Sequence, residues 1–166
     1  MNFREIALAI SEERFSLLVN RATRKGREEV LKACGIRRAT HRILDPKKRR
    51  KVAITKLRDW IESEPGGGNE VAFRLMYNVL SGALRPMVIT ILDQRGISHE
   101  SGITDDLSQL NSIDSGALIS TLSALSGEYD AADIALYFQF TAVDPEFDGL
   151  REALEGAPGC AEALRA

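Results

Sequence analysis

Apolar residues recur along this chain every three to four positions, which is the spacing of one buried face of an α-helix. The pattern is clear between residues 12 and 25, and again between residues 47 and 64. In the second stretch the apolar positions are Ala53, Ile54, Leu57, Trp60 and Ile61. This periodicity predicts an all-α protein.

Residues that favour the ends of helices stand where the periodic stretches begin and stop. Asn2 and Glu5 have the spacing of a capping box, in which each side chain satisfies a free backbone N–H of the first turn. Asp45 followed by Pro46 predicts a helix start, because the aspartate caps and proline fits the first helical position. Gly35 predicts a helix end. These signals support the helical assignment.

A run of proline and three glycines, residues 65–68, interrupts the pattern and predicts a linker, because glycine weakens helices. The predicted organisation has four parts: a basic helical unit (1–64), the linker (65–68), an acidic helical unit (69–155) and a frayed tail (156–166). The alternative is that the two units pack as one domain.

Charge is sorted along the chain and nearly cancels over its whole length. Residues 1–60 contain 17 Lys and Arg against 7 Asp and Glu, a net charge of +10. Residues 61–166 contain 5 Lys and Arg against 17 Asp and Glu, a net charge of -12. Such asymmetry predicts a part that binds a polyanion, or two parts that attract each other.

The segment from Val30 to Leu44 resembles the helix-turn-helix of lactose-repressor-like DNA-binding proteins, because Cys34-Gly35-Ile36 and Thr40 follow a similar pattern. The resemblance implies a recognition helix in the major groove of DNA. The alternative is a helix–glycine–helix corner with a structural role only. The resemblance places these residues on or beside the recognition helix: Arg37, Arg38, Thr40, His41 and Arg42.

Five consecutive cations follow the helix start at Asp45-Pro46. They repel one another and the positive end of the helix dipole, so a bound phosphate would stabilise them. The alternatives are that acidic residues of the second half cover them, or that they form a solvated face. The predicted phosphate-binding residues are Lys47, Lys48, Arg49, Arg50 and Lys51.

A second motif fits part of a calcium-binding loop. Asp144, Glu146, Asp148 and Glu155 fall at positions one, three, five and twelve of such a loop, with Gly149 at position six. A short helix that Asp144 caps explains the same residues. We therefore expect no metal and keep calcium as a minor alternative.

Other chemistry leaves little trace in the sequence. The two histidines have no second nitrogen or thiolate ligand at metal spacing, and no nucleophile elbow or phosphate-binding loop occurs. Two distant cysteines, Cys34 and Cys160, suggest a reducing compartment, and no apolar stretch has the length of a membrane span. These observations predict a cytoplasmic protein that is not an enzyme, has no cofactor and does not bind membranes.

The sequence therefore favours a nucleic-acid-binding regulatory protein, whose acidic unit oligomerises or docks a partner. The alternative is a helical adaptor that associates through complementary charged patches, either with an acidic protein surface or with itself.

Overall fold

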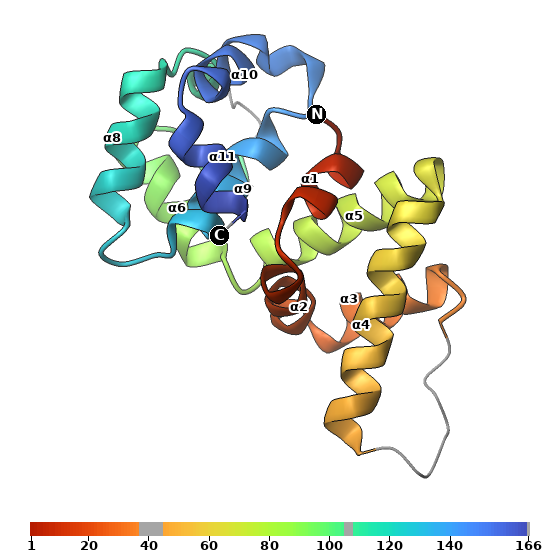
Figure 1. The fold of residues 1–166 in the computed structure, drawn as a ribbon. Coiled ribbons are helices and arrows are strands. Elements are labelled where there is room, and N and C mark those ends of the chain that lie inside the picture. The colour runs from red at the N-terminus through yellow and green to blue at the C-terminus, as the bar shows by residue number, and fades with distance from the viewer. Residues whose placement is uncertain (37–44, 105–107, 166) are drawn as a thin grey trace. The chain divides into compact units, whose positions relative to one another are not determined.

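The fold is all-α, as the periodicity predicts. The computed structural model describes residues 1–36, 45–104 and 108–165, and these residues form eleven α-helices, one short 3₁₀ helix and no strand (Figure 1). Two compact units divide the chain after Gly82. The first unit, from Asn2 to Gly82, contains α1 (Phe3–Ala9), α2 (Glu12–Arg21), α3 (Arg24–Ala33), α4 (Pro46–Ser63) and α5 (Pro65–Leu80). The second contains α6 (Arg85–Gln94), α7 (Ser108–Asn111), α8 (Ser115–Leu125), α9 (Ala131–Thr141), η1 (Pro145–Phe147), α10 (Asp148–Glu155) and α11 (Pro158–Arg165).

The linker predicted at residues 65–68 is wrong, because these residues form the first turn of α5. Glu64 alone separates α4 from α5, and the amide of Gly68 donates to the carbonyl of Glu64 over 2.6 Å. The unit boundary therefore lies some fifteen residues later than the glycines suggest. With this boundary, the first unit holds 18 Lys and Arg against 10 Asp and Glu.

Close packing explains why α5 begins with glycines. A Cβ atom on Gly68 would lie 2.5 Å from the carbonyl oxygen of Ile61, and one on Gly67 would lie 2.9 Å from the ring of Trp60. Both distances are shorter than a real Cβ contact allows, so only glycine lets α5 begin this close to α4. Gly66 has nothing within 4 Å of the equivalent position. Close packing therefore explains Gly67 and Gly68, where it overrides the low helix propensity of glycine, but it does not explain Gly66.

Helix α5 is the centre of the first unit, where it contacts α1, α2, α3 and α4. It is buried on several sides, with Ala72, Leu75, Met76 and Val79 fully shielded from solvent. The surrounding helices add buried side chains at Ile6, Phe15, Leu57 and Ile61. Three of the five positions in the predicted stripe of α4 are buried, namely Ile54, Leu57 and Ile61, and Ala53 and Trp60 are half-buried.

The predicted caps hold this arrangement in place. Asn2 and Glu5 form the capping box of α1, and the Asp45 side chain accepts from the amide of Lys47 with Pro46 in the first turn. Gly35 has a φ of 64°, and the amides of Gly35 and Ile36 donate back to the carbonyls of Lys32 and Leu31. This is the Schellman pattern, which ends α3 at the predicted glycine.

The second unit is built around α9, in which every side chain from Ala132 to Gln139 is buried. The tail predicted to fray is wrong for residues 158–165, which form α11 and pack on α9. Cys160 and Leu164 anchor α11, with exposed fractions of 0% and 2%. Pro158 starts this helix, and a terminal segment that buries apolar side chains is ordered by packing.

Candidate functional site

Three arginines of the first unit neutralise the carboxyl ends of helices, where backbone carbonyls lack partners. Arg4 donates to the carbonyls of Ile61 and Glu62 at the end of α4, over 2.9 and 2.5 Å. Arg27 donates to the carbonyl of Asn20 at the end of α2, over 3.0 Å. These guanidinium groups are held by the fold and are not free to bind an anion.

Arg58 does the same at the end of α1. Its Nη2 donates to the carbonyls of Leu8 and Ile10, over 3.2 and 2.8 Å. Its guanidinium also lies over the ring of Phe15, with the Cζ atom 5.5 Å from the ring centroid. The side chain therefore ties α4 to α1 and α2 through both polar and cation–π contacts.

Other cations of the unit pair with a glutamate one turn away on their own helix. On α3, Arg24 lies 3.0 Å from Glu28 and Lys25 lies 3.9 Å from Glu29. On α5, Arg74 pairs with Glu70. Each pair adds only a few tenths of a kcal/mol to helix stability, but it neutralises the cation locally.

The first half of α4 differs from both groups. Within the described ranges, none of the five predicted phosphate-binding side chains on α4 makes an ion pair or a side-chain hydrogen bond. The side chains of Lys47, Lys48, Arg50 and Lys51 are exposed, and Arg49 is half-buried. The first turn of α4 contains no acidic residue, and the Asp45 carboxylate just before it accepts from the amide of Lys47 as the N-cap. The structure thus brings these five residues together as a cationic helix start.

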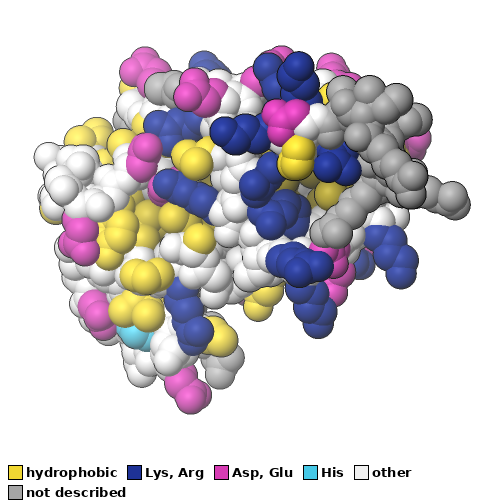
Figure 2. Space-filling view, turned by 90° about the horizontal axis from the view of Figure 1, so that it is seen from below, with side chains coloured by type: hydrophobic (Ala, Val, Ile, Leu, Met, Phe, Trp, Pro, Cys, Tyr) yellow, Lys and Arg dark blue, Asp and Glu magenta, His cyan; other side chains and the backbone are white. Residues whose placement is uncertain are grey.

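The five consecutive cations, residues 47–51, lie on all sides of the first turns of α4. Lys47 and Arg50 continue the line of Ile54, Leu57 and Ile61, which is the face that packs further along α4. Both are exposed, so this face changes from cationic to apolar within two turns. Because 18 of the 22 Lys and Arg residues belong to the first unit, its surface is strongly basic. Figure 2 shows Lys and Arg side chains gathered over one part of the face.

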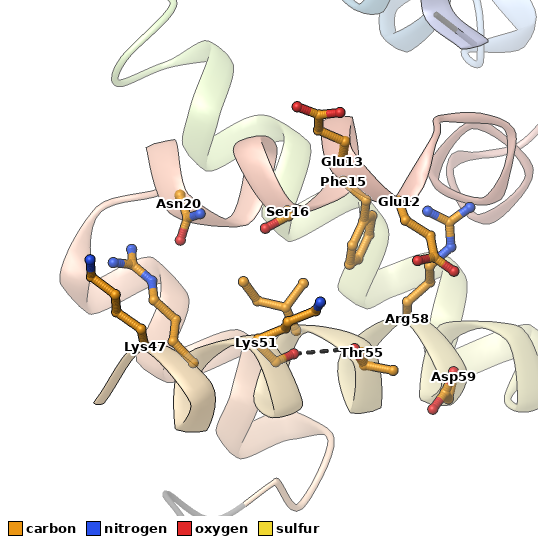
Figure 3. A pocket seen from close by; sticks show the side chains of 12 residues that line it. Glu12, Glu13, Phe15, Ser16, Asn20, Lys47, Lys51, Thr55, Arg58 and Asp59 are labelled. Atoms are coloured by element: carbon orange, nitrogen blue, oxygen red, sulfur yellow. Dashed lines mark hydrogen bonds between the residues drawn. The ribbon is translucent and has the colours of Figure 1, made fainter. Parts of the chain in front are cut away.

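A groove of about 550 Å³ runs between α2 and α4 (Figure 3). Phe15 points into it from α2, and Ile54 lines it from α4. Lys47 lies toward one end, Lys51 near the middle, and Glu12, Arg58 and Asp59 toward the other end. One end is therefore cationic, and the other carries both signs of charge. A second groove of about 400 Å³ lies between α4 and α3. Its lining is Val19, Arg27, Glu28, Leu31, Pro46, Arg49, Arg50, Ala53 and Ile54.

The predicted base-reading residues lie outside the described residues. Arg37, Arg38, Thr40 and Arg42 all fall in the range 37–44, as does His41 beside them, so the predicted recognition helix stays a prediction. The described part of the motif is the first helix and its glycine end, α3 and Gly35.

The residues of the calcium alternative do not form one loop: Glu146 lies in η1, Asp148 and Glu155 lie in α10, and Asp144 precedes η1. The Asp144 side chain accepts from the amide of Glu146 and caps η1, and Asp148 pairs with Arg151 over 2.7 Å. Asp148 and Glu155 lie at opposite ends of α10. Among the residues described, no three His, Cys, Asp or Glu side chains are placed to hold a metal ion.

The two cysteines are buried, and the His99 side chain is hydrogen-bonded within the chain. Burial raises the pKa of both the Cys34 and Cys160 thiols to about 11, which keeps them protonated and unreactive. His99 uses both ring nitrogens within the chain: Nδ1 accepts from the amide of Gly102, and Nε2 lies 3.1 Å from Asp93 Oδ1. These contacts hold the turn at residues 99–102 together.

In the described ranges, no single helix is long and apolar enough to span a membrane; only α5 and α6 counted together have that length and composition.

The structure defines an all-α protein of two helical units, the first of which exposes a cationic helix. Comparison with known proteins adds no narrower class: no family model, no curated protein and no solved structure matches this chain.

The sequence gives no sign of the arginine caps, since the partners of Arg4 and Arg58 lie about 50 residues or more away along the chain. It does contain one overlooked signal. Val52 falls outside the apolar stripe of α4, and the structure leaves 43% of it exposed.

Proposed function

We propose that the first unit binds nucleic acid through the phosphates that the start of α4 attracts. One observation carries this proposal. The five cations at the start of α4, residues 47–51, lack the carboxylate and carbonyl partners that most other described cations of the unit have, Arg58 further along α4 included. Unneutralised cations at a helix N-terminus, where the dipole is also positive, attract polyanions. Phosphate contacts of this kind dominate nucleic-acid affinity and release counterions.

The test compares two triple variants of the full chain that remove equal charge. The first replaces Lys47, Lys48 and Lys51 by glutamine, and the second replaces Arg24, Lys25 and Lys32 on α3. Binding to duplex DNA is measured over a range of salt concentrations. The α4 variant should weaken binding and lower the slope of log K against log[salt] by up to about 3, and the α3 variant should change it little. Equal effects of the two variants would refute the α4 site, and no salt-dependent binding by the unaltered chain would refute nucleic-acid binding.

A second candidate function is that of a protein-interaction module, and the groove between α2 and α4 favours it. Phe15 and Ile54 line it between charged side chains, which suits an amphipathic helical segment that places acidic residues against Lys47 and Lys51. If a second copy of the chain supplies that segment, the average mass in sedimentation should fall as salt is raised, without nucleic acid. A mass that stays monomeric at every salt concentration would refute self-association.

A further inference from the structure

We propose that the outward face of α4 reads duplex DNA from within the major groove. This inference rests on the proposed function and goes further, since phosphate attraction alone carries no sequence information. It assigns base contacts to described residues of α4, of which Val52, Thr55 and Lys56 were not selected by the sequence analysis.

The outward face is a stripe of exposed side chains along α4. Counting from Lys48, its members follow at steps of three, four, seven and eight residues, which is the spacing of one helix face. We call it the outer stripe; its members are Lys48, Lys51, Val52, Thr55 and Lys56, all of them exposed. It shares no residue with the buried stripe through which α4 contacts α1, α2 and α5, although Lys51 and Thr55 also line the groove between α2 and α4.

The outer stripe combines cationic, apolar and hydroxyl side chains. A face that only contacts solvent does not require the apolar one. Three lysines surround Val52, whose side chain is 43% exposed, and Thr55. In the major groove, lysine donates to the O6 and N7 acceptors of guanine, and the threonine and valine methyl groups contact the methyl group of thymine. The Thr55 hydroxyl donates to the carbonyl of Lys51, and its oxygen can still accept from a base amino group.

The dimensions agree with this placement. A helix with its side chains is about 10–12 Å across, and the major groove of B-form DNA is about 12 Å wide. Lys48 and Lys56 are eight residues apart, which is about 12 Å along the helix at a rise of about 1.5 Å per residue. At about 3.4 Å per base pair the outer stripe covers three to four base pairs.

The same face becomes acidic beyond the outer stripe. Asp59 lies three residues after Lys56 and is exposed, and Glu62 follows. Carboxylates repel the phosphates that flank the groove, so the contact should end at this point. Replacing Asp59 by asparagine removes one such repulsion and should strengthen binding severalfold.

The test begins by selecting preferred duplexes from a random pool with the full unaltered chain. The variants Val52→Ala and Thr55→Ala are then compared with Leu17→Ala, which truncates an equally exposed apolar side chain on α2 (40% exposed). Alanine favours helix, so these variants should fold. For Val52→Ala and Thr55→Ala, the ratio of affinities for selected and random duplexes should fall about tenfold, because one lost base contact is worth about 1–3 kcal/mol. The salt slope should stay unchanged, and Leu17→Ala should change neither quantity.

Three results would overturn the inference while leaving the proposed function standing. The first is salt-dependent binding without any preferred duplex. The second is an equal effect of Val52→Ala and Leu17→Ala. The third is equally selective binding to an RNA duplex of the same sequence, because side chains do not reach the bases in its deep, narrow major groove. A complete absence of binding would overturn both proposals.

Discussion

Helices α3 and α4 lie in the same unit and are both rich in cations, but only α3 has glutamates that pair with its cations. On α3, Arg24 and Lys25 each have a glutamate one turn later. On α4, the residues one turn after Lys48 and Lys51 are Val52 and Thr55, which neutralise nothing. The comparison teaches that the number of cations on a helix is a poor guide to how much of their charge stays unneutralised. That depends on whether their partners already lie within the fold.

The largest expected effect is on stability. It compares a cation that is hydrogen-bonded to backbone carbonyls with an exposed cation on the same helix. Arg58→Ala should lower the free energy of unfolding by about 2–3 kcal/mol, because it frees two carbonyls at the end of α1 and removes the contact with Phe15. Lys56→Ala, two residues away and exposed, should change it by less than about 0.5 kcal/mol. Chemical denaturation of both variants measures the difference. Equal losses would contradict the division of cations into held and free.

The second effect concerns the corner that positions α4. Gly68→Ala should cost about 1–3 kcal/mol of stability, because the added methyl group meets the carbonyl oxygen of Ile61. Gly66→Ala is the matched control; it has free space and should be neutral or stabilise by up to about 1 kcal/mol through helix propensity. Thermal unfolding of the two variants gives the comparison. A flexible linker would tolerate both substitutions alike.

A third prediction gives α4 the pairing that α3 already has. The double variant Val52→Glu and Thr55→Glu places a carboxylate one turn after Lys48 and Lys51, in the same order as the pairs on α3. Duplex DNA affinity at low salt should fall at least about tenfold, through pairing and added negative charge. The control adds two glutamates at exposed sites away from α4, Leu17→Glu and Ser120→Glu. A similar loss in the control would show that only net charge matters.

The smallest effect comes from the reverse change, which frees the cations of α3. Glu28→Gln with Glu29→Gln should reduce stability by less than about 1 kcal/mol, since each exposed pair is worth a few tenths. It should strengthen DNA binding by no more than a few fold, through long-range attraction. Titration of a labelled duplex measures this gain. A gain of tenfold or more would place α3 on the DNA as firmly as α4.

Local signals predicted much of the fold because they depend on neighbouring residues. The capping box at Asn2, the Asp45-Pro46 start and the glycine end of α3 each require only a few consecutive residues. The run of proline and glycines at residues 65–68 was wrongly predicted to be a linker, because Gly67 and Gly68 pack against Trp60 and Ile61. Helix propensities do not include such contacts. The tail was mispredicted for the same reason, since α9 orders it.

The sequence predicted which cations cluster at the start of α4, but not that their side chains would lack partners within the fold. The five consecutive cations are evident in the letters, and their common helix follows from Asp45-Pro46. The sequence does not show that they lack partners. The carboxylates and carbonyls that contact the other cations are brought to them by the three-dimensional fold. Val52 shows the reverse case, since its position outside the buried stripe was visible from helical periodicity alone.

The central position of α5 decides how this protein can be divided for experiments. A cut at the glycines, where composition invites one, would leave a fragment ending near residue 64 without the helix that its other four helices surround. Such a fragment would expose Ile6, Phe15, Leu57 and Ile61 to water, and we expect it to aggregate. The shortest fragment that keeps the first unit whole ends at Gly82. Limited proteolysis should accordingly spare the peptide bonds of residues 65–68, because their backbone is held in a helix.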